Sequence, residues 1–318
     1  MNGSREPADR GAARARGVSF VIVTHDSWDF LEGLLPTIPP SVEGLPFEAI
    51  VVDSGSTKPP PAGLMDRIGE LGCLIPSTNR GFGAANNVGA RAASFDSLFF
   101  LNPDTVLMPG CAARLFEAIE TERGGIIVGP SILLPGGGEQ ASAFPLPSLA
   151  GDAVRVAFPA RLFRLLGAKP REGRRRKACG YLSGAAFMMS AAAFERIGGF
   201  DERFFLYHEE TDLFARARGH GIQALFCPEA RVVHWGGGST GGSDFSIRHS
   251  YRSFLLYREL HYGAASLAFA RALILAEMRL KIAALSAVSL VRPAWSRRRR
   301  LYKRLSLEIK THGSPLGR

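Results

Sequence analysis

Three acidic side chains follow an apolar run in the stretch FDERFFLYHEETDLF. Glu209, Glu210 and Asp212 follow Phe204–Tyr207, with His208 between them. Acids are rarely buried without a partner, so carboxylates held against an aromatic wall are candidates for proton transfer or metal binding. The same acids could instead stabilise the first turn of a helix, by about 0.3–1 kcal/mol each, and Asp212 is spaced i,i+4 from Arg216.

A second group of polar residues follows four short apolar runs that are typical of buried parallel strands. The runs are 18–23, 47–52, 71–75 and 97–101, and the polar residues after them include Thr24, Asp26, Asp53, Asn79 and Asp104. Alternating strands and helices predict a mostly parallel sheet, whose ligands bind beyond the carboxyl ends of the strands. We therefore expect these polar residues to share one edge of the sheet.

Two of these residues have a specific chemical interpretation. Asp53 could accept hydrogen bonds from a ribose or a base edge, or it could cap a turn. Asp104 ends the segment Asn102-Pro103-Asp104, where a carboxylate could bind a hard cation such as Mg²⁺. All three residue types also form ordinary turns, so a turn is the alternative.

Glycines accompany two further candidates. The stretch Gly81–Asn86 resembles G-x-G-x-x-G but ends in Asn86, so it is weak evidence for a nicotinamide cofactor. It does predict a close backbone approach near Asn79. His234 ends a β-branched run and precedes Trp235 and three glycines, which leave room for a bulky ligand. A lone histidine is more commonly a packed or surface residue.

The chain of 318 residues, 46% of them hydrophobic, can form one large domain or two smaller ones. We predict a disordered lead-in over 1–17, an α/β domain over 18–245 and a helical, basic extension over 246–318. Further predicted strands are 182–190, 224–227 and 230–233, and further predicted helices are 30–35, 86–93 and 192–197. The four cysteines are scattered singly, which excludes a C-x-x-C zinc site and fits a reducing cytoplasm. The lead-in has no apolar run typical of a signal peptide.

The net charge of +10 is concentrated near the C-terminus. Residues 248–318 carry 15 of the 39 Lys and Arg residues but three of the 29 acids. Such a basic segment favours an anionic surface, either nucleic acid or lipid headgroups. The apolar stretch 264–291 is interrupted by charges, and the longest uncharged run near its end, about ten residues, is shorter than the roughly 20 residues that a spanning helix needs. Arg297–Arg300, Lys303 and Arg304 could each add about 1 kcal/mol at an anionic leaflet, so we expect peripheral membrane contact, with a solvated tail as the alternative.

Taken together, several stretches resemble the inverting family 2 glycosyltransferases of the GT-A fold, in the bacterial rhamnosyltransferase-like branch. They cover roughly residues 18–245 in the order of the family: VSFVIVTHDS, AIVVDSGST, NRGFGAANNVG, FFLNPDT, YLSGAAFMMSAAAFERIGGFDERFFLYHEETDLFARARGHG and VVHWGGGST. The resemblance implies a GT-A-type, Rossmann-like, mostly parallel sheet flanked by helices. It also implies transfer of a sugar from a nucleoside diphosphate-sugar, with dTDP-rhamnose among the candidates, to a hydroxyl of a glycan or lipid-linked acceptor. The resemblance implies that this transfer is a step of cell-envelope polysaccharide synthesis and takes place in the cytoplasm, at the inner face of the cell membrane.

The resemblance also assigns roles to individual residues. Residues that would hold the donor are Thr24, Asp26, Asp53, Asn79, Gly81, Asn86, Asn102 and Asp104. Asp104 fills the last position of an Asp-x-Asp-like metal motif, and His234 would sit beside the diphosphate as a metal ligand for Mg²⁺ or Mn²⁺. Glu210 occupies the place of the general base, although Asp is usual there, so Glu209 and Asp212 remain candidates. Asn102 likewise replaces the more usual Asp.

Three other classes of protein share some of these features. A sugar-1-phosphate nucleotidyltransferase should have a glycine-rich loop after the first strand, where this chain has Thr24–Ser27. A non-enzymatic nucleic-acid binder would explain the basic extension but not the carboxylates at the strand ends, so we expect no nucleic acid. The broken glycine motif disfavours a nicotinamide oxidoreductase.

Overall fold

The computed structural model describes residues 14–149, 151, 176–236, 243–289 and 295–311. The chain divides into two compact units. The first contains the described residues of Met1–Leu146, Pro170–Phe205 and Glu209–Ser239, and the second those of Pro147–Lys169, Leu206–His208 and Thr240–Arg318. The predicted lead-in falls mostly outside the described residues, and its last three residues belong to the first strand.

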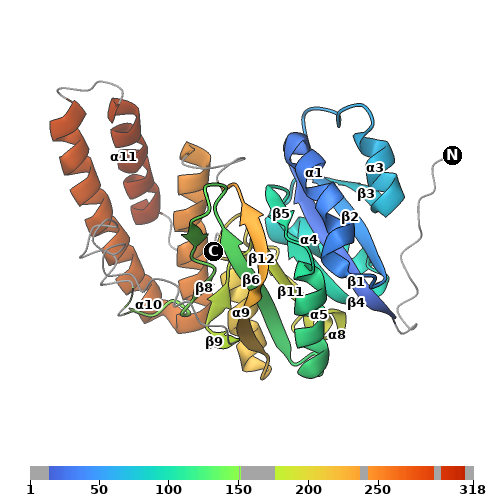
Figure 1. Cartoon of the computed structure of the whole chain (residues 1–318). Coiled ribbons are helices and arrows are strands. Elements are labelled where there is room, and N and C mark those ends of the chain that lie inside the picture. Colours follow the sequence, from blue (N-terminus) through green and yellow to red (C-terminus); the bar gives the residue numbers. More distant parts are fainter. Residues whose placement is uncertain (1–13, 150, 152–175, 237–242, 290–294, 312–318) are drawn as a thin grey trace. The chain divides into compact units, whose positions relative to one another are not determined.

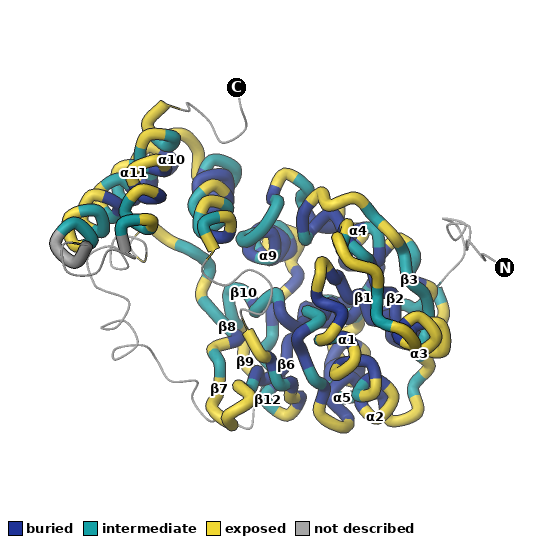
Figure 2. Tube along the Cα trace, turned by 90° about the horizontal axis from the view of Figure 1, so that it is seen from above, coloured by how far each residue is buried: buried dark blue, intermediate teal, exposed yellow. Residues whose placement is uncertain are grey.

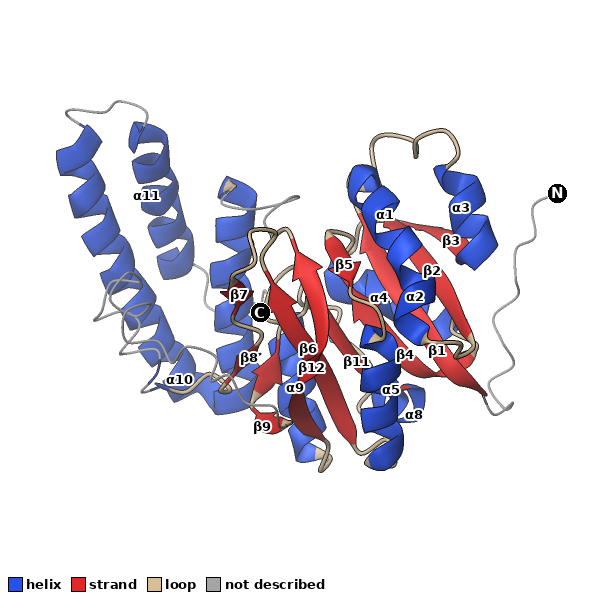
Figure 3. Ribbon diagram, viewed as in Figure 1, coloured by secondary structure: helices blue, strands red, loops and turns tan. Residues whose placement is uncertain are grey.

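The first unit is built on a mixed, mostly parallel sheet (Figures 1 and 3). Its strand order is β3 (Gly72–Ser77), β2 (Phe47–Ser54), β1 (Ala15–Thr24), β4 (Phe95–Leu101), β11 (Ala186–Ser190), β6 (Ile126–Leu133), β12 (Gln223–His234) and β5 (Thr105–Leu107). Strands β11 and β5 run opposite to the others. Short strands β7 (Glu139–Gln140) and β9 (Lys177–Cys179) pair with β6 and β12. Strands β8 (Ala143–Phe144) and β10 (Tyr181–Leu182) pair with each other.

Helices cover both faces of this sheet (Figure 3). One face packs against α1 (Trp28–Leu34), α2 (Ile38–Val42), α3 (Leu64–Leu71) and α5 (Cys111–Thr121), and the other against α4 (Phe82–Ala92), α8 (Ala191–Arg196) and α9 (Glu209–Gly219). Strand β1 shows why, since Phe20 and Ile22 belong to the first core and Val21 and Val23 to the second. A strand that is buried on both faces has a continuous apolar sequence. Figure 2 shows the buried residues of the central strands in dark blue.

The predicted fold class is confirmed, and several element boundaries need correction. The predicted strand 182–190 is two strands, β10 and β11, in different sheets. The predicted strands 224–227 and 230–233 are one strand, β12, whose register shifts between Cys227 and Arg231. Opposite the shift lies Pro130 of β6, which cannot donate to the ladder. Sequence reasoning missed β6 because Gly129 and Pro130 interrupt its apolar run.

The second unit contains a pair of long helices. Helix α10 (Asp244–Ser289) is broken at Gly263, whose φ of 74° is not helical, and α11 is Trp295–Thr311. Both helices contribute to one apolar core that includes Phe254, Ile274, Met278, Leu301 and Leu305. The basic run expected in an extension therefore lies on a helix. Within the described residues, no helix is long and apolar enough to cross a membrane.

Candidate active site

The carboxyl ends of β1, β2 and β3 bring three predicted donor-binding residues together. Thr24 is the register partner of Asp53 across β1 and β2. The loop after β2 approaches Asn79 closely, because a Cβ added to Gly55 would lie 3.3 Å from the Asn79 backbone nitrogen. Thr24 is fully buried, and its Oγ1 has no hydrogen-bond partner among the described residues.

Asp26 ties the loops after β1 and β2 into one rim. Its Oδ1 accepts hydrogen bonds from the backbone nitrogens of Thr57 (2.7 Å) and Lys58 (3.2 Å), and its Oδ2 accepts one from Thr57 Oγ1 (2.9 Å). The hydroxyl of Thr57, followed by these backbone donors, lowers the pKa of Asp26 below its usual value. Asp53 Oδ1 accepts a hydrogen bond from the Ser56 backbone nitrogen at 2.9 Å. Both acids thus fix the loop conformation.

The glycine-rich segment contacts the loop that precedes α9. Gly81 has a φ of 106°, and a Cβ there would lie 2.5 Å from the Phe205 carbonyl oxygen, so only glycine fits. The backbone nitrogen of Phe82 donates to that same oxygen at 2.9 Å. Asn86 is buried, and its side chain donates to the Phe82 carbonyl within α4 (3.0 Å), so its amide already has a partner in the helix.

Asn87 anchors the same loop further upstream. Its Oδ1 accepts from the Phe200 backbone nitrogen (2.9 Å), and its Nδ2 donates to the Phe200 carbonyl (2.9 Å) and to Glu202 Oε1 (3.1 Å). Arg80 pairs with Glu202 at 2.8 Å. Residues 200–205, which lead toward the acidic cluster, are therefore held by α4 and the residues around its start.

Asp104 and His234, the two predicted metal ligands, lie side by side. His234 Nε2 is 3.2 Å from Asp104 Oδ1, and both side chains are largely buried. The strand ladder explains the pairing, because His234 is the register partner of Thr105 and the Trp235 backbone nitrogen donates to the Asp104 carbonyl (3.0 Å). The other ring nitrogen, Nδ1, is 3.0 Å from Gln140 Oε1 on β7.

This arrangement fits a divalent cation. An amide oxygen can only accept, so Gln140 Oε1 selects the tautomer that carries its proton on Nδ1. In the neutral ring, the lone pair of Nε2 then faces the Asp104 carboxylate, and two acceptors at this distance need a proton or a cation between them. Among the described residues no group of three or more His, Cys, Asp or Glu side chains is placed to hold a metal ion. Mg²⁺ commonly takes one or two protein ligands and completes its shell with water and substrate phosphates.

The three acids of the cluster differ in their surroundings. Asp212 is buried and accepts from Arg216 Nε (2.8 Å) one turn along α9, and Arg216 also donates to the Ile197 carbonyl. Glu209 is buried, and its Oε2 has no hydrogen-bond partner among the described residues. Glu210 is partly exposed and begins, with Glu209, a helix preceded by two residues of positive φ, Tyr207 (68°) and His208 (65°).

Burial raises the pKa of both glutamates at the start of α9. For Glu209 burial is the largest cause and the charge of Glu210 adds to it, and the pKa lies well above the usual 4.5. For Glu210 burial again raises the pKa, while the backbone N–H groups of Glu210 and Thr211 oppose it. Tyr181 on β10 is near enough for the charge of Glu210 to raise the pKa of its phenol as well, in addition to burial.

The loop 183–185 between β10 and β11 joins the two halves of the site. The Asn102 backbone nitrogen donates to the Ala185 carbonyl at 2.9 Å. A Cβ added to Gly184 would lie 3.6 Å from the Cδ atom of Glu210. One short loop therefore contacts both the segment that carries Asp104 and the side chain of Glu210.

Sequence reasoning did not identify several residues of the site. Gln140 lies on a two-residue strand after three glycines, and no local pattern marks it. Thr57 and Tyr181 are visible only through contacts with residues far along the chain. Asn87 follows the glycine-rich segment in the sequence, but no local pattern predicts its role. Its hydrogen-bond partner Phe200 lies 113 positions further along the chain.

Comparison with known proteins places the chain in a family. The model for glycosyl transferase family 2 matches residues 19–198, so the chain belongs to that family. The chain is 28% identical over 260 residues to N-acetylglucosaminyl-diphospho-decaprenol L-rhamnosyltransferase of Mycobacterium tuberculosis, a match that covers 76% of this chain and 84% of the relative. It is also 28% identical over 160 residues to the low-salt glycan biosynthesis hexosyltransferase Agl10 of Haloferax volcanii, covering 49% of each chain.

Solved structures show the same fold. The mannosyltransferase PcManGT of Pyrobaculum calidifontis, in complex with GDP-Man and Mn²⁺, aligns with a TM-score of 0.52 and 15% identity over 96% of this chain and 91% of the other. GalNAc-T7 with UDP, GalNAc and Mn²⁺ aligns with a TM-score of 0.57 and 18% identity over 78% of this chain, which spans about half of that protein (48%). The protein is thus a glycosyltransferase with a GT-A fold, not a nucleotidyltransferase or a nicotinamide oxidoreductase.

Proposed function

We propose that this glycosyltransferase moves a sugar, with inversion, from a nucleoside diphosphate-sugar to a hydroxyl of a lipid-linked glycan. The observation that carries the proposal is the shared loop 183–185, which adjoins both the Asp104 segment and Glu210. A group that binds the leaving diphosphate and a base that activates the acceptor must flank the same sugar. The name of the mycobacterial relative supports a lipid-linked acceptor in cell-envelope synthesis and makes dTDP-rhamnose the first donor to test.

On the donor side, the residues at the strand ends bind the nucleotide. Asp53 is fixed by the Ser56 backbone through Oδ1, so its Oδ2 is available to accept from a ribose hydroxyl or a base edge. The rim held by Asp26 and the close approach at Gly81 keep the loops in place without a ligand. Thr24 lies beside Asp53, Asn79 lies beside the loop that follows Asp53, and Asn102 positions the segment that leads to Asp104.

Asp104 and His234 would hold a divalent cation, Mg²⁺ or Mn²⁺, together with the diphosphate of the donor. When bound, the ion neutralises the charge that develops on the leaving group. Gln140 holds the His234 ring in the tautomer that leaves Nε2 free to bind a cation. Carboxylate and imidazole ligands suit either ion, and the PcManGT and GalNAc-T7 structures were solved with Mn²⁺.

Glu210 is the general base. Its side chain adjoins Gly184 and Tyr181, whereas Asp212 is committed to Arg216. Glu209 is more deeply buried than Glu210, and an acceptor hydroxyl must reach the base. The raised pKa of Glu210 makes it a stronger base than an ordinary carboxylate, and a positioned base contributes about 10²–10⁴-fold to the rate.

A thermal-shift screen of nucleotide sugars tests the donor side of this proposal. The full chain should melt at a higher temperature with one class of nucleotide sugar, and the shift should need Mg²⁺ or Mn²⁺. An ion-independent shift, or none with any nucleotide sugar, would contradict the role of Asp104 and His234.

Peripheral contact with an anionic membrane is also part of the proposal, and it should weaken as the salt concentration is raised.

A further inference from the structure

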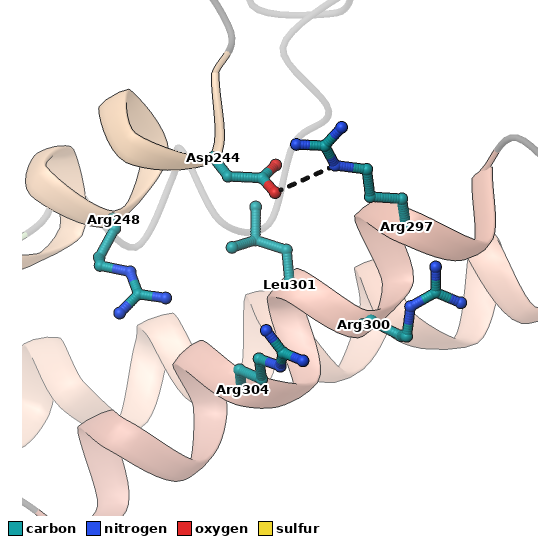
Figure 4. A pocket seen from close by; sticks show the side chains of 6 residues that line it. All are labelled: Asp244, Arg248, Arg297, Arg300, Leu301 and Arg304. Atoms are coloured by element: carbon teal, nitrogen blue, oxygen red, sulfur yellow. Dashed lines mark hydrogen bonds and ion pairs between the residues drawn. The ribbon is translucent and has the colours of Figure 1, made fainter.

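A basic cavity lies within the second unit, between the start of α10 and the helix α11 (Figure 4). Its volume is about 260 Å³. The residues that line it are Asp244, Arg248, Arg297, Arg300, Leu301 and Arg304, and we call it the arginine pocket. Figure 4 shows Arg248 extending from α10 and Arg304 from α11 into the space between the helices.

Helical periodicity gathers the arginines of α11 on one face. Arg297, Arg300 and Arg304 follow the i, i+3, i+7 spacing that places side chains on the same side of a helix. Leu301, at i+4, is buried in the core formed by α10 and α11 and forms the floor of the pocket. The three arginines are therefore held around a fixed apolar base.

The positive charge in the pocket is only partly neutralised. Asp244 is the one acid among the lining residues, and it lies 3.4 Å from Arg297 Nε and 4.0 Å from Arg298 Nη1. Both distances exceed the length of a charge-assisted hydrogen bond, which is usually about 2.7–2.9 Å. Arg248 pairs with Glu308 at 3.0 Å.

The remaining two arginines are available to a ligand. Arg300 has a long contact of 3.4 Å with Ser296 Oγ. In the described part of the chain, Arg304 takes part in no hydrogen bond or ion pair. Both side chains are exposed, so their donors can turn toward an anion without breaking a strong contact.

We propose that the arginine pocket binds a phosphate or diphosphate group. A guanidinium presents several donors in a planar fork that matches the oxygens of phosphate, and forks from two helices can engage different oxygens of one group. A multiply charged anion also neutralises the charge of four guanidinium groups better than a single carboxylate does. A lipid phosphate and a soluble phosphate share this chemistry. The site does not depend on the sugar-transfer proposal, because all its residues lie in the second unit.

The test compares two double variants of the full chain that lose the same charge. R300Q/R304Q removes the two available arginines of the pocket. K303Q/K310Q removes two exposed lysines of α11 that lie about 90° and 110° around the helix from the centre of the arginine face. One arm measures sedimentation with phosphatidylcholine vesicles that contain phosphatidic acid, and the other measures binding of inorganic pyrophosphate by calorimetry without divalent ions.

R300Q/R304Q should bind at least fivefold more weakly in one arm, while K303Q/K310Q stays within twofold of the wild type. The arm that responds identifies the source: vesicles for a lipid phosphate, pyrophosphate for a soluble one. The pyrophosphate signal of the donor site is common to all three proteins, so only the difference counts. R300K/R304K keeps the charge without the forks and should bind less well than the wild type. Equal changes in both double variants, or no change in either arm, would overturn the proposal.

Discussion

His234 Nε2 lies 3.2 Å from Asp104 Oδ1, and the opposite ring nitrogen of His234 is 3.0 Å from Gln140 Oε1. His234 comes from β12, Asp104 from the segment before β5, and Gln140 from β7. Only the folded sheet therefore brings the three side chains together. When Nδ1 carries the proton and donates it to the amide oxygen of Gln140, the lone pair of Nε2 in the neutral ring faces the Asp104 carboxylate. In the mechanism that we propose, both groups would bind a divalent cation beside the leaving diphosphate.

Gln140→Leu should weaken metal-dependent binding of the donor nucleotide. The substitution removes the acceptor that fixes the His234 tautomer, and loss of such a partner typically costs about 10–100-fold in metal affinity or activity. Gln140→Glu keeps an acceptor and should bind near the wild-type level. Calorimetry of the nucleotide with and without Mn²⁺ checks this. Metal-dependent affinity in Gln140→Leu equal to that of the wild type would show that the contact is incidental.

The rate of transfer should depend on the ionisation of Glu210. A general base must be deprotonated, and burial raises the pKa of Glu210 above the usual 4.5. Activity should therefore fall as the pH decreases through this raised pKa, at a higher pH than an ordinary glutamate would give. The pH profile of kcat measures it. A rate that stays constant down to pH 4.5 would remove Glu210 from this role.

Glu209→Gln should stabilise the protein at alkaline pH. The folded state raises the pKa of Glu209 well above 4.5, so the folded state holds this proton more tightly than the unfolded chain does. That contribution to stability is fully present below about pH 4.5 and is lost as the pH rises through the raised pKa. The uncharged variant avoids this loss, and its free energy of unfolding should exceed that of the wild type by about 1–3 kcal/mol at pH 8. Urea unfolding at pH 5 and pH 8 measures the difference, which should be smaller at pH 5; equal differences would contradict the prediction.

Asp212→Asn should lower stability without moving the pH profile. The carboxylate is buried and pairs with the partly exposed Arg216. Removal of one partner of a fully buried pair costs about 3–5 kcal/mol, so the loss in this half-buried pair should be smaller, about 2 kcal/mol. Thermal unfolding should show a lower Tm, whereas Asp66→Asn, at an exposed position of α3, should stay within about 0.5 kcal/mol of the wild type. A stable Asp212→Asn variant whose acid limb has shifted would instead make Asp212 the base.

The sequence predicted the parallel half of the sheet because its strands are buried on both faces and read as continuous apolar runs. Strands β1, β2 and β4 begin and end within three residues of the predicted ranges. Strand β6 escaped prediction since Pro130 and Gly129 interrupt its pattern, and β12 was divided in two at its register shift. Strands β6 and β12 pair with each other across these irregular positions. The two strands are far apart in the sequence, so a local sequence pattern does not reveal the pairing.

The candidate site was predictable where it depends on strand ends. Parallel strands bring their carboxyl ends to one edge, so Thr24, Asp53 and Asn79 could be grouped from spacing alone. The grouping of Gln140 with His234 could not, because it depends on a two-residue strand and a separation of 94 positions. The segment 246–318 was predicted to be helical and basic, but the side chains that form its core and those that line the arginine pocket are known only once α10 and α11 pair.

The most direct test of the proposed mechanism separates donor binding from transfer in two variants. Glu210→Gln should bind the nucleotide sugar and Mn²⁺ as tightly as the wild type but transfer sugar at least 10²-fold more slowly, roughly. Asp104→Asn should lose the metal-dependent part of donor binding. Affinity by calorimetry and product formation with the same donor measure both properties. A Glu210→Gln variant that transfers at the wild-type rate, or an Asp104→Asn variant that keeps metal-dependent binding, would contradict the mechanism.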